Sequence, residues 1–227
     1  MMRSFDDRQS IYTEPRFALS ALVTIDTQRD VLDGGALEIP GTSMALGPIC
    51  ALARAFREAG LPIVHVVRLY KPDGSNVDLC RRQAVQDGAK MLAVDSDGSQ
   101  LAEALLPDPR VKLDAEMLLS GRPQRLGDDE YVFYKPRWGA FYRTSLEEHL
   151  RQRAVTTLVF AGCNFPNCPR TSIYEASERD FRIVVARDAL SGLDDRGEQE
   201  LAAIGVLTKS TPEIAAKLAN LQATSRA

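Results

Sequence analysis

Short apolar runs recur along this chain, and segments with the spacing of amphipathic helices separate several of them. Uninterrupted runs of this length are typical of strands buried in a parallel sheet. Strands that alternate with helices predict an α/β fold in three layers, α/β/α, with a mainly parallel sheet covered by helices on both faces. The six predicted strands cover residues 21–25, 62–67, 131–134, 157–161, 182–186 and 205–208.

Residues that favour helix ends mark several of the helices between these strands. Gly60 suits the position just after a helix, Thr144 and Glu147 have the spacing of a capping box, and Pro212 follows a Ser or Thr that can cap the last helix. The predicted helices cover residues 44–59, 100–106 and 145–152, together with segments that begin at Pro169 and near Pro212.

The length of 227 residues suits one domain with a sizeable core. Residues 1–17 are polar and mixed, so we expect an N-terminal arm, either disordered or packed on a neighbouring subunit, followed by a single domain over residues 18–227. The span 70–129 is long and rich in turn signals, and such connections inside compact domains are usually functional. We therefore expect this span to cover the site.

Three residues with reactive side chains follow closely on predicted strands. Asp26, Lys135 and Cys168 each lie just beyond the carboxyl end of a strand, where ligands bind in open α/β sheets, so we expect them to meet at one edge. Pro169 favours the first position of a helix, which predicts that Cys168 caps that helix. The helix dipole and the free N–H groups there predict a depressed thiol pKa and a site for an anion.

Short motifs surround these residues in a fixed order. An apolar strand ends in Asp-x-Gln at 26–28, Lys135 is followed by a small residue and Ala-Phe at 139–141, and the Cys168 turn is followed by Asp-Ala at 188–189. Together they resemble the isochorismatase-like cysteine hydrolases, a family that includes nicotinamidases, carbamoylsarcosine and biuret amidohydrolases and ureidoacrylate hydrolases. The resemblance covers most of the chain, and it implies an isochorismatase-like, Rossmann-like hydrolase fold.

The resemblance implies a catalytic triad of Asp26, Lys135 and Cys168. In that chemistry the thiolate attacks an amide carbonyl and forms a thioester, Asp26 takes the thiol proton and returns it to the leaving amine, and Lys135 stays charged between them. The resemblance also implies that the backbone N–H groups of Asn164 and Cys168 bind the oxyanion. It further implies a cis peptide bond between Cys163 and Asn164.

Aromatic and polar residues near the motifs are candidates for substrate contacts. Four aromatic side chains are candidates for an apolar slot, and Arg137, Asn164 and Asn167 are candidates for polar contacts. Gln28 and Asp30 are interpreted as organising the loop behind Asp26 rather than as contacting substrate. The turn before Cys168 departs from the family's usual sequence, and this departure affects the expected substrate more than the nucleophile. The candidates are Gln28, Tyr70, Arg137, Trp138, Phe141, Phe165 and Asn167.

The two histidines of this chain, His65 and His149, stand on separate predicted elements. A Cys-His dyad is therefore not indicated, and both histidines are interpreted as structural. Nicotinamidases of the family that the chain resembles bind a metal through an Asp and two His after the second strand, whereas residues 68–75 contain no histidine. We expect no metal and no cofactor, and nicotinamide is disfavoured as a substrate.

The charge and the cysteine spacing of the chain indicate which binding partners and which cell compartment to expect. The net charge is −3 and the pI is about 5.5, with scattered basic residues, so nucleic-acid binding is not indicated. No apolar run reaches membrane-spanning length and the first residues do not resemble a signal peptide, so we expect no membrane partner. The four cysteines lack disulfide or metal spacing, which favours the cytoplasm. We also expect a homo-oligomer, a dimer or a tetramer.

The function that these patterns favour is metal-independent hydrolysis of a carbon–nitrogen bond in an amide, ureido or carbamoyl group of a small molecule. One alternative is a vinyl-ether hydrolase of isochorismatase type, although the true isochorismatases characteristically lack the cysteine that this chain retains. A second is a binding or scaffold protein without catalysis. A third is a thiol redox protein that uses Cys163 and Cys168, whose spacing does not resemble Cys-x-x-Cys.

Overall fold

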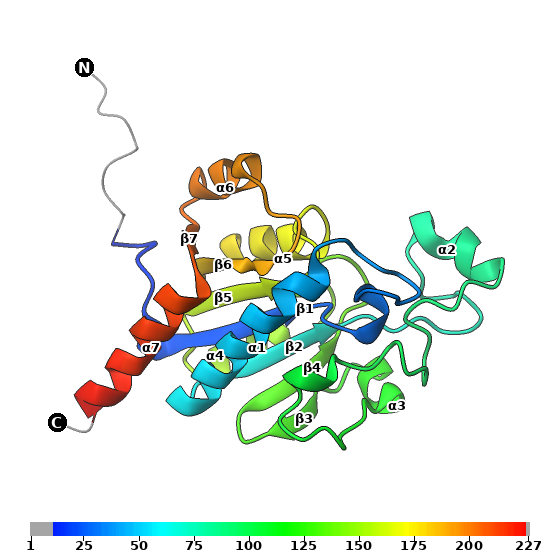
Figure 1. The fold of residues 1–227 in the computed structure, drawn as a ribbon, viewed down its shortest axis with the longest axis horizontal. Helices are drawn as coiled ribbons and strands as arrows, with labels where there is room; N and C mark the ends of the chain where they lie inside the picture. The colour runs from blue at the N-terminus through cyan, green and yellow to red at the C-terminus, as the bar shows by residue number, and fades with distance from the viewer. Residues whose placement is uncertain (1–10, 226–227) are drawn as a thin grey trace.

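A single twisted sheet runs through the part of the chain that the structure describes, residues 11–225 of this computed structural model (Figure 1). Its order is β3-β4-β2-β1-β5-β6-β7, and every neighbouring pair is parallel except β3 and β4. The strands are β1 (Ser20–Ile25), β2 (Ile63–Val67), β3 (Gln124–Gly127), β4 (Glu130–Tyr134), β5 (Thr157–Gly162), β6 (Arg182–Leu190) and β7 (Leu207–Lys209). The predicted parallel α/β architecture is confirmed.

One strand was not foreseen in the sequence. The prediction had six strands, and the described residues contain a seventh, β3, which pairs antiparallel with β4 at the edge of the sheet. Its residues, Gln-Arg-Leu-Gly, are mainly polar and none of them is fully buried. A strand that packs so little lacks the apolar pattern by which buried strands are recognised.

Helices cover both faces of the sheet. In Figure 1, α1 and α7 cross the near face, while α2 projects from one end of the sheet. The helices are α1 (Thr42–Ala59), α2 (Leu79–Gln86), α3 (Ala115–Leu119), α4 (Leu146–Gln152), α5 (Cys168–Ser177), α6 (Asp195–Ala202) and α7 (Thr211–Ser225). Short 3-10 turns lie at Phe17–Leu19, Arg29–Val31 and Glu103–Leu105.

The central strand β1 supplies side chains to two cores, one on each face. Leu22 packs with Ile49 of α1 and Leu218 of α7, whereas Val23 packs with Ile173 of α5 on the opposite face. All five are almost completely buried. Each such side chain contributes roughly 1.5–3 kcal/mol through burial, so the sheet edge that carries the site is held by packing on both sides.

Two local predictions are wrong. The helix expected over 100–106 is only the turn Glu103–Leu105, because the Ala102 N–H donates to Thr27 O at 3.0 Å and ties this segment to the loop after β1. The capping box before α4 does not form, since Thr144 Oγ1 donates instead to Ala140 O at 2.6 Å. Glu147 pairs with Arg179 at 3.2 Å rather than with the start of its own helix.

The described part of the N-terminal arm lies against this same chain. The Arg16 N–H donates to Thr157 Oγ1 at 2.9 Å, at the amino end of β5. Thr13 adjoins Gly205, where a Cβ would come within 2.7 Å of it. Residues 1–10 lie outside the described range, so the division into an arm and a domain stays a prediction. No helix in residues 11–225 has the length and apolar character needed to cross a membrane.

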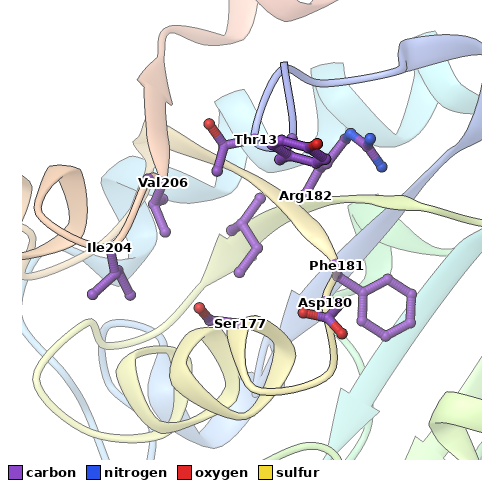
Figure 2. Close-up of a pocket in the computed structure, with 10 residues that line it drawn as sticks. Thr13, Ser177, Asp180, Phe181, Arg182, Ile204 and Val206 are labelled. Atoms are coloured by element: carbon purple, nitrogen blue, oxygen red, sulfur yellow. The ribbon is translucent and has the colours of Figure 1, made fainter. Parts of the chain in front are cut away.

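Thr13 also borders a pocket of about 400 Å³ (Figure 2). Figure 2 shows Thr13 and Arg182 on one side of it and Ser177 and Asp180 on the other. Arg182 begins β6, so the pocket lies at the amino end of that strand. Ligands in parallel sheets bind at the opposite, carboxyl ends, and the three reactive residues lie there.

Candidate active site

Asp26 and Lys135 form a buried ion pair across the carboxyl edge of the sheet. Asp26 follows β1 and Lys135 follows β4, and the Lys135 Nζ lies 2.8 Å from Asp26 Oδ2. Lys135 has no exposed surface and Asp26 is 7% exposed. A charge buried this deeply needs a partner, and each of these residues provides one for the other.

The turn after β5 is built against Asp26. Gly162 has φ +120°, and a Cβ there would lie 2.2 Å from Ile25 O, so only glycine fits. The next residue, Cys163, donates its N–H to Ile25 O at 2.9 Å and its thiol to Asp26 O at 3.3 Å. These contacts fix the chain that leads to Cys168 beside the end of β1.

Cys168 is the first residue of α5, and Asn167 occupies the cap position. The expected cap is therefore shifted by one residue. Ser172 Oγ donates to Cys168 O at 2.7 Å and accepts from the Ala140 N–H at 3.0 Å. Glu175 Oε2 accepts from the Phe141 N–H at 2.9 Å. The loop after Lys135 is thus bonded to α5, which sets the position of the thiol relative to the lysine.

The pKa of Cys168 is raised, so the expectation of a depressed thiol pKa is wrong for this state of the site. Burial is the largest cause, and the negative charge of Asp26 raises the pKa further, whereas the positive charges of Lys135 and Arg68 lower it. Cys168 is 5% exposed, and desolvation disfavours a thiolate more than one turn of helix favours it. The raised pKa favours the neutral thiol, and the carboxylate of Asp26 lies close enough to contribute to this shift.

The two carboxylate oxygens of Asp26 differ in their contacts. Oδ2 receives Lys135, while Oδ1 is buried and has no hydrogen-bond partner among the described residues. The contact with the Cys168 thiol does not meet strict hydrogen-bond geometry, although the carboxylate lies near enough to raise the pKa of that thiol. A buried oxygen left without a donor is unusual, and a proton arriving from sulfur would satisfy it.

Two backbone N–H groups near the thiol are also without partners. Within residues 11–225 the N–H groups of Asn164 and Cys168 donate to no other residue, whereas that of Phe165 donates to Ser191 O at 2.7 Å and that of Asn167 to Asn164 O at 3.0 Å. Asn164 and Cys168 line one cavity. Two unpaired donors in one cavity can receive an oxyanion.

The peptide bond between Cys163 and Asn164 is trans, so the prediction of a cis bond is wrong. The reversal between β5 and α5 is made by backbone dihedral angles instead. Gly162 supplies φ +120°, and Asn167 has φ −115° and ψ −107°. The assignment of Asn164 to an oxyanion pocket therefore depends on its unpaired N–H and its place in the cavity, not on the geometry of that bond.

Arg68 is a site residue that the sequence analysis missed. It follows β2 directly, is 1% exposed, and its Nη2 lies 3.7 Å from Cys168 Sγ. Its Nη1 donates to Asp78 Oδ2, and Asp78 is buried as well. The signal was present, because Arg68 follows the carboxyl end of a strand as Asp26 and Lys135 do.

The cavity at the thiol has a volume of only about 20 Å³. A single water needs roughly 10–15 Å³ measured in this way, so the cavity accommodates one water and not an amide substrate. Helix α2, which has no buried residue, contributes Arg81 to the wall. The lining residues are Asp26, Val31, Leu37, Ile39, Arg68, Arg81, Leu92, Cys163, Asn164, Asn167 and Cys168.

Of the candidate substrate contacts, Asn167 lines this cavity and the others do not. Gln28 is fully engaged: its Nε2 donates to Arg68 O and Ser99 O, and its Oε1 accepts from the Arg68 N–H. It therefore positions Arg68. Tyr70 donates its hydroxyl to Asp78 at 2.9 Å.

The remaining candidates have structural contacts. The Trp138 ring lies 5.6 Å from the Arg68 guanidinium, so it supports that residue. Phe141 and Phe165 are buried in the hydrophobic core that also contains Ile173 of α5. Arg137 donates to Asn76 O and Pro136 O. Of these four residues, Trp138 contacts the cavity lining, through Arg68 and Arg81.

The residues after β2 do not fit the metal site of the nicotinamidases. Arg68 places a cation beside the thiol, and Asp78 is already bonded to that cation. Among residues 11–225 no three His, Cys, Asp or Glu side chains are grouped as metal ligands. His65 is buried within β2 between Thr24 and Glu130, at 2.8 Å from each, and so holds the sheet together.

Comparison with known proteins identifies the family. The sequence pattern of the isochorismatase domain matches residues 20–214. The chain belongs to the isochorismatase family. A crystal structure of an isochorismatase family protein from Desulfovibrio vulgaris shares its fold with a TM-score of 0.75 and 27% identity, covering 88% of this chain and 98% of that one.

Two relatives of this isochorismatase family member carry functional names. A probable inactive nicotinamidase of Arabidopsis thaliana is 26% identical over 211 residues, which are 90% of this chain and 98% of that protein. A ureidoacrylate amidohydrolase of Methylobacterium radiotolerans is 27% identical over 191 residues, which are 76% of this chain and 67% of that enzyme. The family thus includes enzymes that act on amide carbon–nitrogen bonds.

Proposed function

We propose that this protein is a cysteine hydrolase that cleaves a carbon–nitrogen bond in an amide, ureido or carbamoyl group of a small molecule, without a metal. The observation that carries the proposal is the buried Asp26–Lys135 pair: Asp26 has one carboxylate oxygen without a partner among the described residues and lines the same cavity as Cys168. The amidohydrolase among its relatives supports the class of reaction.

The first half of the reaction forms a thioester. Asp26 Oδ1 accepts the thiol proton, and Lys135 and Arg68 stabilise the resulting thiolate by charge. Sulfur attacks the substrate carbonyl carbon, and the carbonyl oxygen becomes an oxyanion held by the N–H groups of Asn164 and Cys168. Loss of one such donor in other enzymes lowers the rate about 100- to 1000-fold. The proton on Asp26 then passes to the nitrogen, and the carbon–nitrogen bond breaks.

The second half returns the enzyme to its resting state. Asp26, again a carboxylate, takes a proton from a water as that water attacks the thioester carbonyl. The carbon–sulfur bond breaks, the acid leaves, and the proton on Asp26 returns to the Cys168 thiolate. The cavity in the resting state has space for one water. The same carboxylate thus acts as base and then as acid in each half of the reaction.

The test is to measure turnover of a panel of primary amides, ureas and N-carbamoyl amino acids, with ammonia release as the assay. We expect wild type to hydrolyse at least one class, and Cys168→Ala and Cys168→Ser to show none, because a serine hydroxyl ionises far less readily than a thiol. Cys80→Ala is the matched control, since Cys80 is exposed on α2. Acyl adducts on Cys168 should appear by mass spectrometry after rapid acid quenching.

Other outcomes favour the alternatives. Activity in Cys168→Ala within about tenfold of wild type would remove the thiol from the mechanism, and cleavage of a vinyl ether by that variant would favour the isochorismatase type of reaction. A folded protein with neither turnover nor an adduct would be a binding member of the family. A redox function would require a disulfide between Cys163 and Cys168, both of which are free thiols here.

A further inference from the structure

The backbone N–H of Asn164 is held in place only by the residues on either side of it. It donates to no other residue within residues 11–225, so no hydrogen bond of its own fixes its direction. Before it in the chain, Cys163 donates its N–H to Ile25 O at 2.9 Å and its thiol to Asp26 O at 3.3 Å. These contacts fix one side of the turn, so the direction of the Asn164 N–H also depends on what holds residue 165.

The backbone of Phe165 is anchored at the end of β6. Its N–H donates to Ser191 O at 2.7 Å, and the Ser191 N–H donates to Gly162 O at 3.1 Å. The Ser191 hydroxyl lies 3.1 Å from the hydroxyl of Thr42, at the start of α1, and both residues are buried. The backbone that follows Asn164 is thus bonded to the sheet and, through Ser191, to α1.

The Phe165 ring packs against α6, a helix that contributes no residue to the cavity lining. Phe165 is 3% exposed, and a Cβ added to Gly197 of α6 would lie 2.4 Å from its Cε1 and 3.1 Å from its Cδ1. The Arg170 guanidinium lies 5.6 Å from the centroid of the same ring. Because carbon atoms that are not bonded to each other pack at about 3.5–4.0 Å, any residue larger than glycine at position 197 would displace the ring.

The backbone of α6 does not itself require a glycine at this position. Gly197 does not have the positive φ that favours glycine. Its N–H donates to Asp194 Oδ1 at 2.8 Å, a contact that any residue except proline can make. Glycine is also less favourable than alanine within a helix. The constraint on position 197 that the structure shows is therefore the space occupied by the Phe165 ring.

We propose that Phe165 is a positioning residue of the oxyanion site: its ring, packed against Gly197, keeps the N–H of Asn164 directed into the cavity that Asn164 and Cys168 line. The role of that N–H rests on the proposed function, whereas the packing of the ring rests on the contacts described above. A displaced ring moves the Phe165 backbone, because the side chain is buried, and this movement turns the neighbouring N–H. In the competing explanation, Phe165 and Gly197 only hold α6 on the core.

Gly197→Ala tests the packing of the ring. We expect it to lower kcat by about 10- to 100-fold on any substrate that wild type hydrolyses, because a small displacement from the reactive geometry costs up to about 100-fold in rate. KM should stay nearly unchanged. The pH profile of Cys168 alkylation by iodoacetamide should also stay as in wild type, because Asp26 and Lys135 are not displaced. Gly47→Ala is the matched control, since Gly47 lies within α1 and a Cβ there would meet nothing within 4 Å.

A compensating substitution separates positioning from a loss of stability. In the double variant Gly197→Ala with Phe165→Leu, the smaller side chain makes room for the new methyl group, so we expect a higher kcat than in Gly197→Ala alone. Phe165→Leu leaves α6 unchanged and should itself lower kcat without raising KM, so it tests the role of the ring even if Gly197→Ala does not fold. Additive losses of kcat in the double variant would contradict a contact between the two residues.

Crystal structures of the variants make the test independent of turnover. We expect Gly197→Ala to show the Phe165 ring displaced and the Asn164 N–H turned from its direction in wild type, and Gly47→Ala to show neither change. A displaced ring beside an unmoved N–H, or an unchanged kcat, would overturn the positioning role. A fall in Cys168 alkylation as large as the fall in kcat would assign the effect to the thiol instead. If wild type hydrolyses nothing while the N–H turns as expected, the proposed function fails and the positioning of the N–H by Phe165 is retained.

Discussion

Lys135 Nζ lies 2.8 Å from Asp26 Oδ2 although β2 separates their strands in the sheet. The long lysine side chain spans that strand and brings its charge close enough to Cys168 to lower the pKa of that thiol. Because both partners are buried, the pair acts on Cys168 through a medium that screens charge weakly. The carboxylate and the ammonium have opposite effects on the thiol, which makes their contributions separable by mutation.

Asp26→Asn should abolish turnover and at the same time lower the pKa of Cys168. The amide can neither accept the thiol proton nor return it, and the substitution removes a negative charge that raises the pKa. The rate of Cys168 alkylation by iodoacetamide against pH gives that pKa, with Cys168→Ala to subtract the other cysteines. Lys135→Met should shift the same profile upward. If the pH profile of Cys168 alkylation in both variants were the same as in wild type, neither group would be near the sulfur.

The two single variants should also be less stable than the double variant. Leaving one buried charge without its partner costs about 3–5 kcal/mol, whereas replacing both charges by neutral groups is often close to neutral. Urea unfolding of Asp26→Asn, Lys135→Met and the combination forms a double-mutant cycle. Additive losses of stability would mean that the ion pair does not hold in solution.

The parts of the site that could be predicted from sequence are those set by strand ends. Asp26 and Lys135 follow apolar runs, and parallel strands bring their carboxyl ends to one edge, so their meeting follows from topology. Arg68 obeys the same rule and was missed because its segment was examined for metal ligands. Helix α2, by contrast, joins the site through tertiary contacts of Arg81 that no local pattern encodes.

The direction in which the pKa of the Cys168 thiol shifts could not be predicted from the strand ends. A helix start favours a thiolate, but the net direction depends on burial and on charges from β1, β2 and β4 together. The trans peptide bond before Asn164 could not be predicted from the sequence either. The chain reverses between β5 and α5 through the backbone angles of Gly162 and Asn167, which these residue types permit but do not specify.

The protein should become less stable at low pH because the Glu130 carboxylate becomes protonated. Burial raises the pKa of Glu130, but hydrogen bonds from Arg57 and His65 overcome this and lower it to about 2 from an ordinary value of 4.5. A depressed carboxyl pKa adds stability that is complete above the unfolded value and is lost as pH falls toward the folded value. The free energy of unfolding, measured with urea, should therefore be higher for wild type than for Glu130→Gln at pH 6. This difference should shrink between about pH 4.5 and 2. A constant difference over that window would contradict the assignment.

Turnover should survive extended treatment with EDTA. Arg68 occupies the position after β2 beside the thiol, and Asp78 is bonded to it, so a divalent cation would meet a positive charge there. The measurement is the specific activity before and after chelation and dialysis. Loss of activity that zinc restores would show that the reaction depends on a metal.

Alkylation should reach Cys80 well before Cys168. Cys80 is exposed on α2, whereas Cys168 is 5% exposed in a cavity of about 20 Å³ and its pKa is raised. Since the thiolate is the reactive form, both burial and pKa slow Cys168, and we expect its rate with iodoacetamide at pH 7.5 to be at least about 100-fold lower. Peptide mapping after timed quenching gives the two rates in one sample. Preferential labelling of Cys168 would mean that the site is open at rest and that its thiol is already ionised, which would overturn the assignment of Asp26 as the base that activates it.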